Sequence, residues 1–195
     1  KPEVAAITNV GPAHLEGFID IEGVARTKGE IYASLPADGT AVMNRGEAWL
    51  DLWTDMNRAG NVRYFNGNEA GDIRAEIEGG GCRVLTPEGE FELSLTLPGR
   101  HNIDNALAAT AVCLSLGVSL NTIRDGLADV RAVKGRLNLV QALSGWTVID
   151  DTYNANPASL YAALQVLSSQ NGEPWLVLGD MKELGSDSHK IHAEV

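Results

Sequence analysis

The sequence predicts an α/β fold, with a mostly parallel central sheet, an antiparallel β meander and then the start of a second α/β domain. Short apolar runs with β-branched residues alternate with segments of helical period over residues 4–65, which is typical of a parallel sheet. Residues 73–97 instead alternate apolar with polar side chains, as strands do when one face is wet. The strand and helix alternation returns after residue 145.

The elements of the first domain follow from these patterns in order. Strands are expected at 4–7, 40–44 and 61–65, and helices at 21–35 and 47–59. The antiparallel meander is expected to contain strands at 73–77 and 91–97, with turns at 79–81 and 87–89. Further helices are expected to open at 98–102 and to run over 120–130. After a polar connector at 131–135, strands are expected at 146–150 and 175–178, with a helix at 158–168 between them.

Composition narrows the classes of function. The chain has 195 residues and a formal net charge of -11, which argues against a nucleic-acid or anionic-membrane surface. Cys82 and Cys113 form neither a disulfide framework nor a metal-ligand spacing, and no signal peptide is visible, so a cytoplasmic protein is expected. No apolar run is long enough for membrane insertion. A monomer is expected.

The stretch 8–35 is the candidate catalytic site. His14 follows the first strand, where ligands collect in open α/β sheets. Lys28 falls in the apolar stripe of the next helix, between Val24 and Ile31, where an ammonium would need a partner or a lowered pKa. A neutral amine there could add carbon dioxide and become an acid. Spacing alone also allows a Lys28 with its head in water and a His14 that is a loop residue.

The residues of this stretch carry a resemblance. NVGPAHLEGF at 9–18, followed by EGVARTKGEI at 22–31, resembles the central domain of the Mur ligases. The resemblance implies that His14 is a magnesium ligand. It also implies that Lys28 is carbamylated, so that its carbamate holds a second magnesium ion and both residues are catalytic.

Two further segments resemble the same family and concern ATP. GRHNIDNALAA at 99–109 is similar to a family segment whose asparagines lie by the adenine, which implies that Asn102 and Asn105 bind there. Helix position alone would instead favour an N-cap and a polar surface residue. Gly135-Arg136-Leu137 resembles the linker whose arginine reaches the ATP phosphates, a role that suits a planar, permanently charged fork.

The segment DDTYNANP at 150–157 resembles the same family strongly, with Thr152 in place of serine. By resemblance Asp151 contacts the ATP ribose, and Tyr153 and Asn154 face the nucleotide or the reacting centre. Without the resemblance, a carboxylate and amides at a strand end indicate a ligand crevice and no more.

The resemblance implies an ATP- and Mg²⁺-dependent ligase of peptidoglycan precursor synthesis. Its substrates would be UDP-N-acetylmuramoyl-tripeptide, phosphorylated on its carboxylate, and D-alanyl-D-alanine, whose amine attacks the acyl phosphate. Arg136 and the magnesium ions would offset charge on the transferring phosphoryl group. Two alternatives stand beside this reading. One is another ligase of the superfamily, such as a folylpolyglutamate or cyanophycin synthetase, and the other is a non-catalytic nucleotide-binding module.

The resemblance also divides the chain. Residues 1–133 would be the central ATP-binding domain without its phosphate-loop part, and 134–195 a truncated, Rossmann-like C-terminal domain. No G-x-x-x-x-G-K-[ST] occurs in the sequence, although the family carries this loop upstream of the first strand. We therefore expect a fragment that is inactive by itself.

Overall fold

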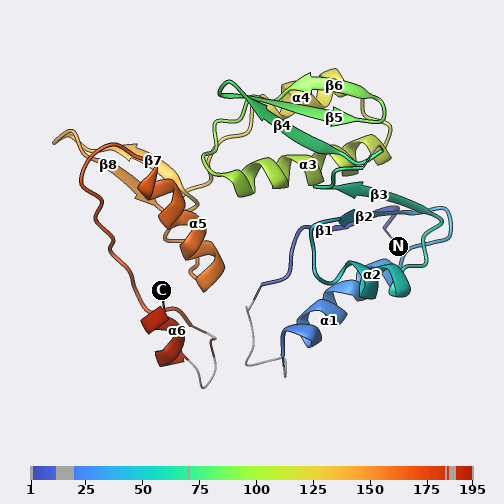
Figure 1. Ribbon diagram of the computed structural model, residues 1–195, viewed down its shortest axis with the longest axis horizontal. Coiled ribbons are helices and arrows are strands. Elements are labelled where there is room, and N and C mark those ends of the chain that lie inside the picture. The colour runs from blue at the N-terminus through green and yellow to red at the C-terminus, as the bar shows by residue number, and fades with distance from the viewer. Residues whose placement is uncertain (1, 12–19, 70, 183, 185–187, 195) are drawn as a thin grey trace. The chain divides into compact units, whose positions relative to one another are not determined.

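The computed structural model describes residues 2–11, 20–69, 71–182, 184 and 188–194, and Figure 1 labels their elements. The chain divides into two compact units. The first comprises residues 1–10, 22–95 and 100–130, and the second comprises residues 11–21, 96–99 and 131–195. Within the described residues, no helix is long and apolar enough to cross a membrane.

A parallel sheet lies at the centre of the first unit. Its strands are β1 (Val4–Ile7), β2 (Thr40–Asn44) and β3 (Asn61–Phe65), hydrogen-bonded in that order. The predicted strands and their parallel direction are confirmed. Because all three strands run the same way, their carboxyl ends meet at one edge of the sheet, where polar side chains can gather.

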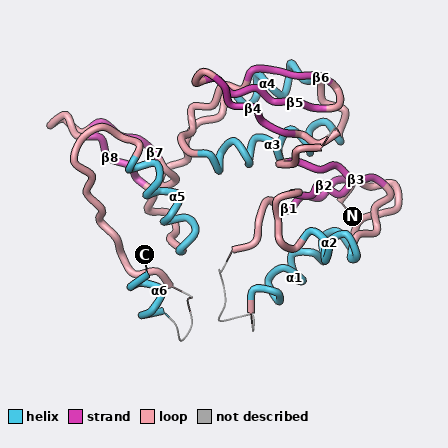
Figure 2. The backbone as a smooth tube through the Cα atoms, in the orientation of Figure 1, coloured by secondary structure: helices cyan, strands magenta, loops and turns pink. Residues whose placement is uncertain are grey.

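Helices cover both faces of this sheet, as the tube in Figure 2 shows. The helices are α1 (Ile21–Ala33) and α2 (Leu50–Met56) on one face and α3 (Arg100–Ser115) on the other. Tyr32 and Trp53 are fully buried on the α1 and α2 side, with their rings edge to face at 5.9 Å between centroids. The Tyr32 hydroxyl donates to the Val42 carbonyl over 2.6 Å and accepts the Ile7 N–H over 3.0 Å. The last turn of α1 is thereby tied to two strands.

The predicted meander is a separate antiparallel sheet in the first unit. Its strands are β4 (Arg74–Glu78), β5 (Gly81–Thr86) and β6 (Gly89–Glu92), and a single parallel bridge links Phe65 with Ile73. The strand predicted to reach residue 97 ends at Glu92. The reason is geometric: Leu93 N–H still bonds Cys82 O, but β5 begins at Gly81 and leaves nothing to pair with the residues beyond. Helix α4 (Leu120–Ala128) follows α3 and is capped by the Ser119 side chain.

The second unit contains an antiparallel pair and two helices. Its elements are β7 (Asn138–Gln141), β8 (Thr147–Asp150), α5 (Pro157–Ser168) and α6 (Ser188–Glu194). Strand β7 is not among the predicted elements, whereas β8 and α5 are confirmed. Asn156 caps α5 through a reciprocal pair of hydrogen bonds with Ser159, and Pro157 stands in the first turn, where its missing N–H leaves no bond unmade.

The strand predicted at 175–178 is not formed. This segment is extended but unpaired within the described part of the second unit, where the ladder consists of β7 and β8. Its apolar side chains are exposed to solvent: Trp175 is 78% exposed and Val177 is 98% exposed. An apolar run predicts that a segment can pair, but a strand also needs a neighbour for its N–H and C=O groups.

Candidate functional site

Lys28 lies on α1, beside the carboxyl end of β1. Its Nζ donates a hydrogen bond to the Asn9 carbonyl oxygen over 3.0 Å, and the side chain is exposed. The prediction that Lys28 sits inside the core-facing stripe is therefore wrong, and Ile31, expected in the same stripe, is 39% exposed. The buried residues of α1 are Val24, Ala25, Gly29 and Tyr32, so the position of Val24 in the predicted stripe is confirmed.

Gly29 explains why Lys28 lies outside the buried face of this helix. A methyl group at Gly29 would lie 2.9 Å from both Trp53 Cδ1 and Met56 Sδ, closer than packed carbon atoms approach. The absence of a side chain therefore lets α2 pack directly on this face of α1. Successive residues of a helix are turned by about 100°, so Lys28 is directed to the flank of the contact, toward the end of β1.

Glu47 is a polar residue of this edge that sequence reasoning missed. Its Oε1 accepts the Val10 N–H over 3.3 Å, so it holds the segment that follows β1. Burial raises the pKa of the Glu47 carboxyl, while the Val10 hydrogen bond and the charge of Lys28 act to lower it. Its position just after β2, at the same edge as Asn9, was the signal that could have identified it.

Asn44 ties the ends of β1 and β2 together. Its Nδ2 donates to the Thr8 carbonyl over 2.8 Å, and its Oδ1 accepts the Gly46 N–H over 2.9 Å. The side chain is buried, and both ends of its amide are used. The carboxyl edge of the sheet is thus a rigid frame beside Lys28.

His14 lies outside the described residues. Among the residues that the structure describes, no group of three histidine, cysteine or acidic side chains could hold a metal ion. Lys28 as an ammonium donates its hydrogen bonds and repels a cation. A carbamate on the same nitrogen would supply oxygen atoms beside Glu47, and such a donor set suits magnesium.

The asparagine pair lies in the first turns of α3. Asn105 Nδ2 and Asn102 Oδ1 are 3.5 Å apart, so the two side chains share one face of the helix, as expected for residues three apart. The helix begins at Arg100, so the N-cap alternative for Asn102 is wrong. Asn102 is half-buried and Asn105 exposed, which leaves the second amide open to a ligand.

In the second unit, the structure brings Arg136 and the segment after β8 together. The Arg136 guanidinium carbon lies 4.1 Å from the centre of the Tyr153 ring. Two hydrogen bonds from main-chain N–H groups join the same two segments. Tyr153 N–H donates to Gly135 O over 2.9 Å, and Leu137 N–H donates to the Asp151 side chain at Oδ1 over 3.0 Å. Three of the predicted residues, Arg136, Asp151 and Tyr153, are therefore neighbours.

The remaining side chains of this loop are held locally. Asp150 Oδ1 accepts the Thr152 hydroxyl over 2.7 Å, and this hydrogen bond is the main reason that the pKa of Asp150 lies below its ordinary value. Asn154 Oδ1 accepts the Ala155 N–H over 3.0 Å, which leaves its Nδ2 for another partner. Asn154 and Tyr153 are both exposed.

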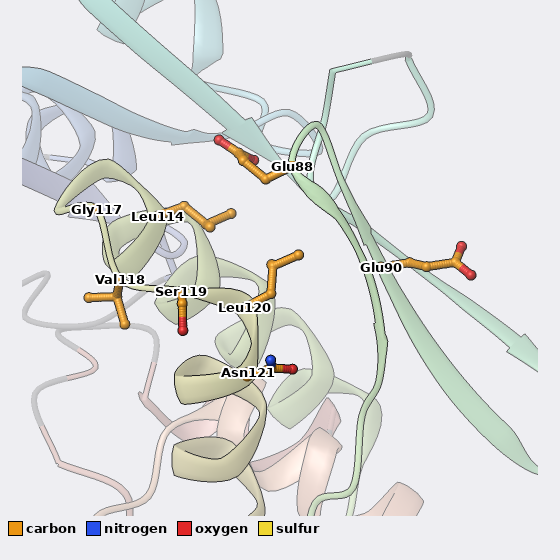
Figure 3. Close-up of a pocket in the computed structure, with 8 residues that line it drawn as sticks. All are labelled: Glu88, Glu90, Leu114, Gly117, Val118, Ser119, Leu120 and Asn121. Carbon is orange, nitrogen blue, oxygen red and sulfur yellow. The ribbon is translucent and has the colours of Figure 1, made fainter.

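A cavity of about 480 Å³ lies elsewhere in the first unit, between the β5–β6 hairpin and the segment that joins α3 to α4 (Figure 3). The residues that line it are Glu88, Glu90, Leu114, Gly117, Val118, Ser119, Leu120 and Asn121. The described candidate residues are not among them. Two carboxylates at its rim also make it unsuited to a phosphate group.

The fold and the candidate residues together define a class of protein. It is an α/β protein whose candidate polar side chains lie at the carboxyl ends of strands and at the linker before β7. Two families match the chain, described as "Mur ligase middle domain" over residues 1–113 and "Mur ligase, glutamate ligase domain" over residues 135–195. The chain belongs to the Mur ligases.

Relatives agree over the whole chain. It is 42% identical to the UDP-N-acetylmuramoyl-tripeptide--D-alanyl-D-alanine ligase of Haemophilus influenzae and 43% identical to that of Escherichia coli, with 100% of the chain covered in both cases. A crystal structure of MurF from Acinetobacter baumannii superposes with a TM-score of 0.89 at 39% identity over 99% of the chain. MurF ligase from Thermotoga maritima in complex with ADP superposes at 0.80 with 29% identity, also over 99%.

The chain spans less than half the length of these relatives. It covers 43% and 44% of the two curated ligases, and 43% and 45% of the two solved chains. Their similarity therefore concerns the part of the protein that contains the parallel sheet, the meander, the linker and the loop after β8.

Proposed function

We propose that the protein to which this chain contributes is an ATP-dependent carboxylate-amine ligase of peptidoglycan precursor synthesis. It would add D-alanyl-D-alanine to UDP-N-acetylmuramoyl-tripeptide through an acyl phosphate. The observation that carries the proposal is identity of 42% and 43%, spread over the entire chain, to two ligases named for that reaction. Action as a monomer in the cytoplasm is part of the same proposal.

Lys28 and His14 are the proposed magnesium ligands, with Lys28 acting as a carbamate. The position of Lys28 at the carboxyl end of β1 supports this role, because the lysine nitrogen reaches a strand edge where ligands collect. Bound magnesium would supply positive charge that stabilises the transferring phosphoryl group. Glu47 and Asn44 would keep the segment after β1 in place beside it.

Six further candidate residues are proposed for the nucleotide and the reacting centre. Asn102 and Asn105 would bind the adenine, since side-chain amides can donate and accept along a purine edge. Asp151 would bind the ribose, and Arg136 the phosphates, for which an exposed guanidinium is suited. Tyr153 and Asn154 would face the nucleotide or the reacting centre.

We also propose that a domain boundary follows residue 133, with a central domain at 1–133 and a C-terminal domain from 134. The matched ranges 1–113 and 135–195 support it, and so do the hydrogen bonds that join Gly135 and Leu137 to the loop after β8. Because the sequence contains no phosphate loop, these 195 residues are proposed to be inactive alone.

The decisive experiment is an amide-ligation assay on the full-length protein with ATP, magnesium and the two substrates. Lys28→Ala should lower activity by roughly 100-fold, the loss expected when a metal site is disrupted. Short carboxylic acids should restore part of it, because they replace the missing carboxylate. Arg26→Ala is the matched control, since it removes an exposed cation two residues away on the same helix.

Three outcomes would be informative. Loss with rescue supports the carbamate role of Lys28. Unchanged activity in Lys28→Ala would make it a surface lysine that bonds Asn9. A wild-type protein that binds ATP but forms no amide bond would instead favour a non-catalytic nucleotide-binding module.

A further inference from the structure

The linker at Gly135–Leu137 is locked onto the loop that follows β8. Gly135 has φ +76°, and a methyl group there would lie 3.0 Å from Tyr153 N and 3.3 Å from Thr152 Oγ1. Only glycine adopts this conformation and also permits so close an approach. The contact is thus built by the backbone, before any side chain of the linker is considered.

The next two residues add to the contact between the linker and the loop after β8. Leu137 is buried with φ +47°, and its N–H is held by the half-buried Asp151 carboxylate. Arg136 stands between these two fixed points, so its Cα has little freedom. Its guanidinium then lies over the Tyr153 ring, whose backbone N–H is itself bonded to Gly135.

An arginine over an aromatic ring is oriented without losing its hydrogen-bond donors. The positive charge is attracted to the ring face, while all five N–H groups remain available at the edge of the guanidinium plane. No carboxylate forms a salt bridge with Arg136 among the described residues whose ion pairs the structure gives. A ring therefore holds this arginine in place while it can still receive an anion.

We propose that Tyr153 is a positioning residue that holds the Arg136 guanidinium by its ring face, ready for a phosphate group. The inference rests on the proposed function, because it takes the phosphates of ATP as the anion. It deepens that proposal and narrows the role given to Tyr153 there: the tyrosine acts through the arginine, and not by a contact of its own with the nucleotide.

Kinetics on the full-length protein test the proposal. Tyr153→Leu removes the ring, and kcat for ligation should fall about five- to tenfold, since a guanidinium held only by its own chain is less well positioned. Tyr153→Phe keeps the ring and should retain activity within about twofold. Tyr161→Leu is the matched control, because Tyr161 is 65% exposed, as Tyr153 is 66% exposed, and should leave activity unchanged.

A double-mutant cycle separates this role from direct contact with the nucleotide. In an Arg136→Ala background, Tyr153→Leu should cause almost no further loss, because the residue through which it acts is gone. An equal loss in both backgrounds, expressed in KM for ATP, would overturn the proposal and make Tyr153 a nucleotide contact.

NMR of the same protein, labelled on arginine and without ATP, gives a readout independent of turnover. The Arg136 side-chain resonances, assigned through Arg136→Lys, should show the upfield shift that a ring face causes. The shift should persist in Tyr153→Phe and vanish in Tyr153→Leu. If the Arg136 chemical shift is unchanged in Tyr153→Leu, the inference is overturned. If the wild-type protein shows the upfield shift but forms no amide bond, the proposed function is overturned instead.

Discussion

The two units place their candidate residues by different means. The first unit buries two apolar clusters around its parallel sheet, with Trp53 and Tyr32 at the centre of one of them. The described part of the second unit buries one small cluster, Leu160, Met181 and Leu184. Yet it is the second unit that brings three predicted site residues, Arg136, Asp151 and Tyr153, close together.

The difference shows that a site can be assembled from local geometry where the core is small. Lys28 owes its position to the packing of α1 against α2 and the sheet, so its surroundings come from distant parts of the chain. Arg136 and Tyr153 owe theirs to a glycine with positive φ and to main-chain hydrogen bonds. The first arrangement depends on tertiary stability and the second much less.

The largest effect on stability should come from Trp53 of the first unit, with Trp146 of the second unit as its control. Trp53→Ala removes a fully buried ring whose Nε1 donates to Ala25 O over 3.0 Å, and should cost roughly 3–5 kcal/mol of unfolding free energy. Trp146→Ala is the control, since Trp146 is 73% exposed, and should change it by about 0.5 kcal/mol or less. Denaturant unfolding of the 195-residue chain, followed by circular dichroism, measures both. Equal losses would contradict the contrast between the units.

A smaller difference in unfolding free energy should distinguish two carboxylates, Asp72 in the first unit and Asp151 in the second. Asp72 is 2% exposed, pairs with Arg45 at 2.9 Å and accepts the Glu69 N–H. Asp72→Ala should destabilise the chain by about 3 kcal/mol, because it leaves a charge without its buried partner. Asp151→Ala removes one half-buried hydrogen bond to Leu137 and should cost about 1 kcal/mol. The same unfolding measurement applies, and a larger loss in Asp151→Ala would show that the second unit depends on the linker contact.

The smallest effect should be a difference in pH dependence. Burial raises the pKa of Glu47 above its ordinary 4.5, so folding is favoured while the group is protonated, and that contribution is lost as pH rises through the folded-state value. Glu47→Gln should therefore gain stability relative to wild type between pH 4 and pH 7. Asp150 behaves oppositely, because the Thr152 hydroxyl lowers its pKa below 3.8: its contribution is present above that value and lost as pH falls.

Asp150→Asn should therefore be the less stable protein at pH 7 and should approach wild type in acid. Unfolding midpoints across the range from pH 3 to pH 7 measure both variants. If the two variants changed in the same direction with pH, the assignment of burial to one carboxyl and a local hydrogen bond to the other would be wrong.

Most of the fold could be predicted because it is encoded locally. The apolar runs at β1, β2 and β3 and the proline at the start of α5 are local signals that locate their elements along the chain. Pairing could not be predicted in the same way. The run at 175–178 has the composition of a strand, but the ladder it would need is absent from the described second unit.

The candidate site was predictable to the extent that its motifs are contiguous. Asp151, Tyr153 and Asn154 share one loop, so their proximity follows from the sequence. The side-chain contact of Tyr153 with Arg136 bridges the β7–β8 hairpin and has no signal in spacing. Periodicity also misplaced Lys28, because it counts side chains, and α2 packs against α1 at Gly29, which has none.

The Tyr32 hydroxyl, one turn beyond Lys28, fixes helix α1 to the parallel sheet. A single oxygen atom closes a hydrogen-bonded junction between the helix, the end of β1 and the middle of β2. Neither strand can slide, and the helix cannot roll, without opening that junction and leaving two main-chain groups unsatisfied at once. The helix that carries the lysine is therefore fixed to the same two strands whose carboxyl ends form the edge that the lysine reaches.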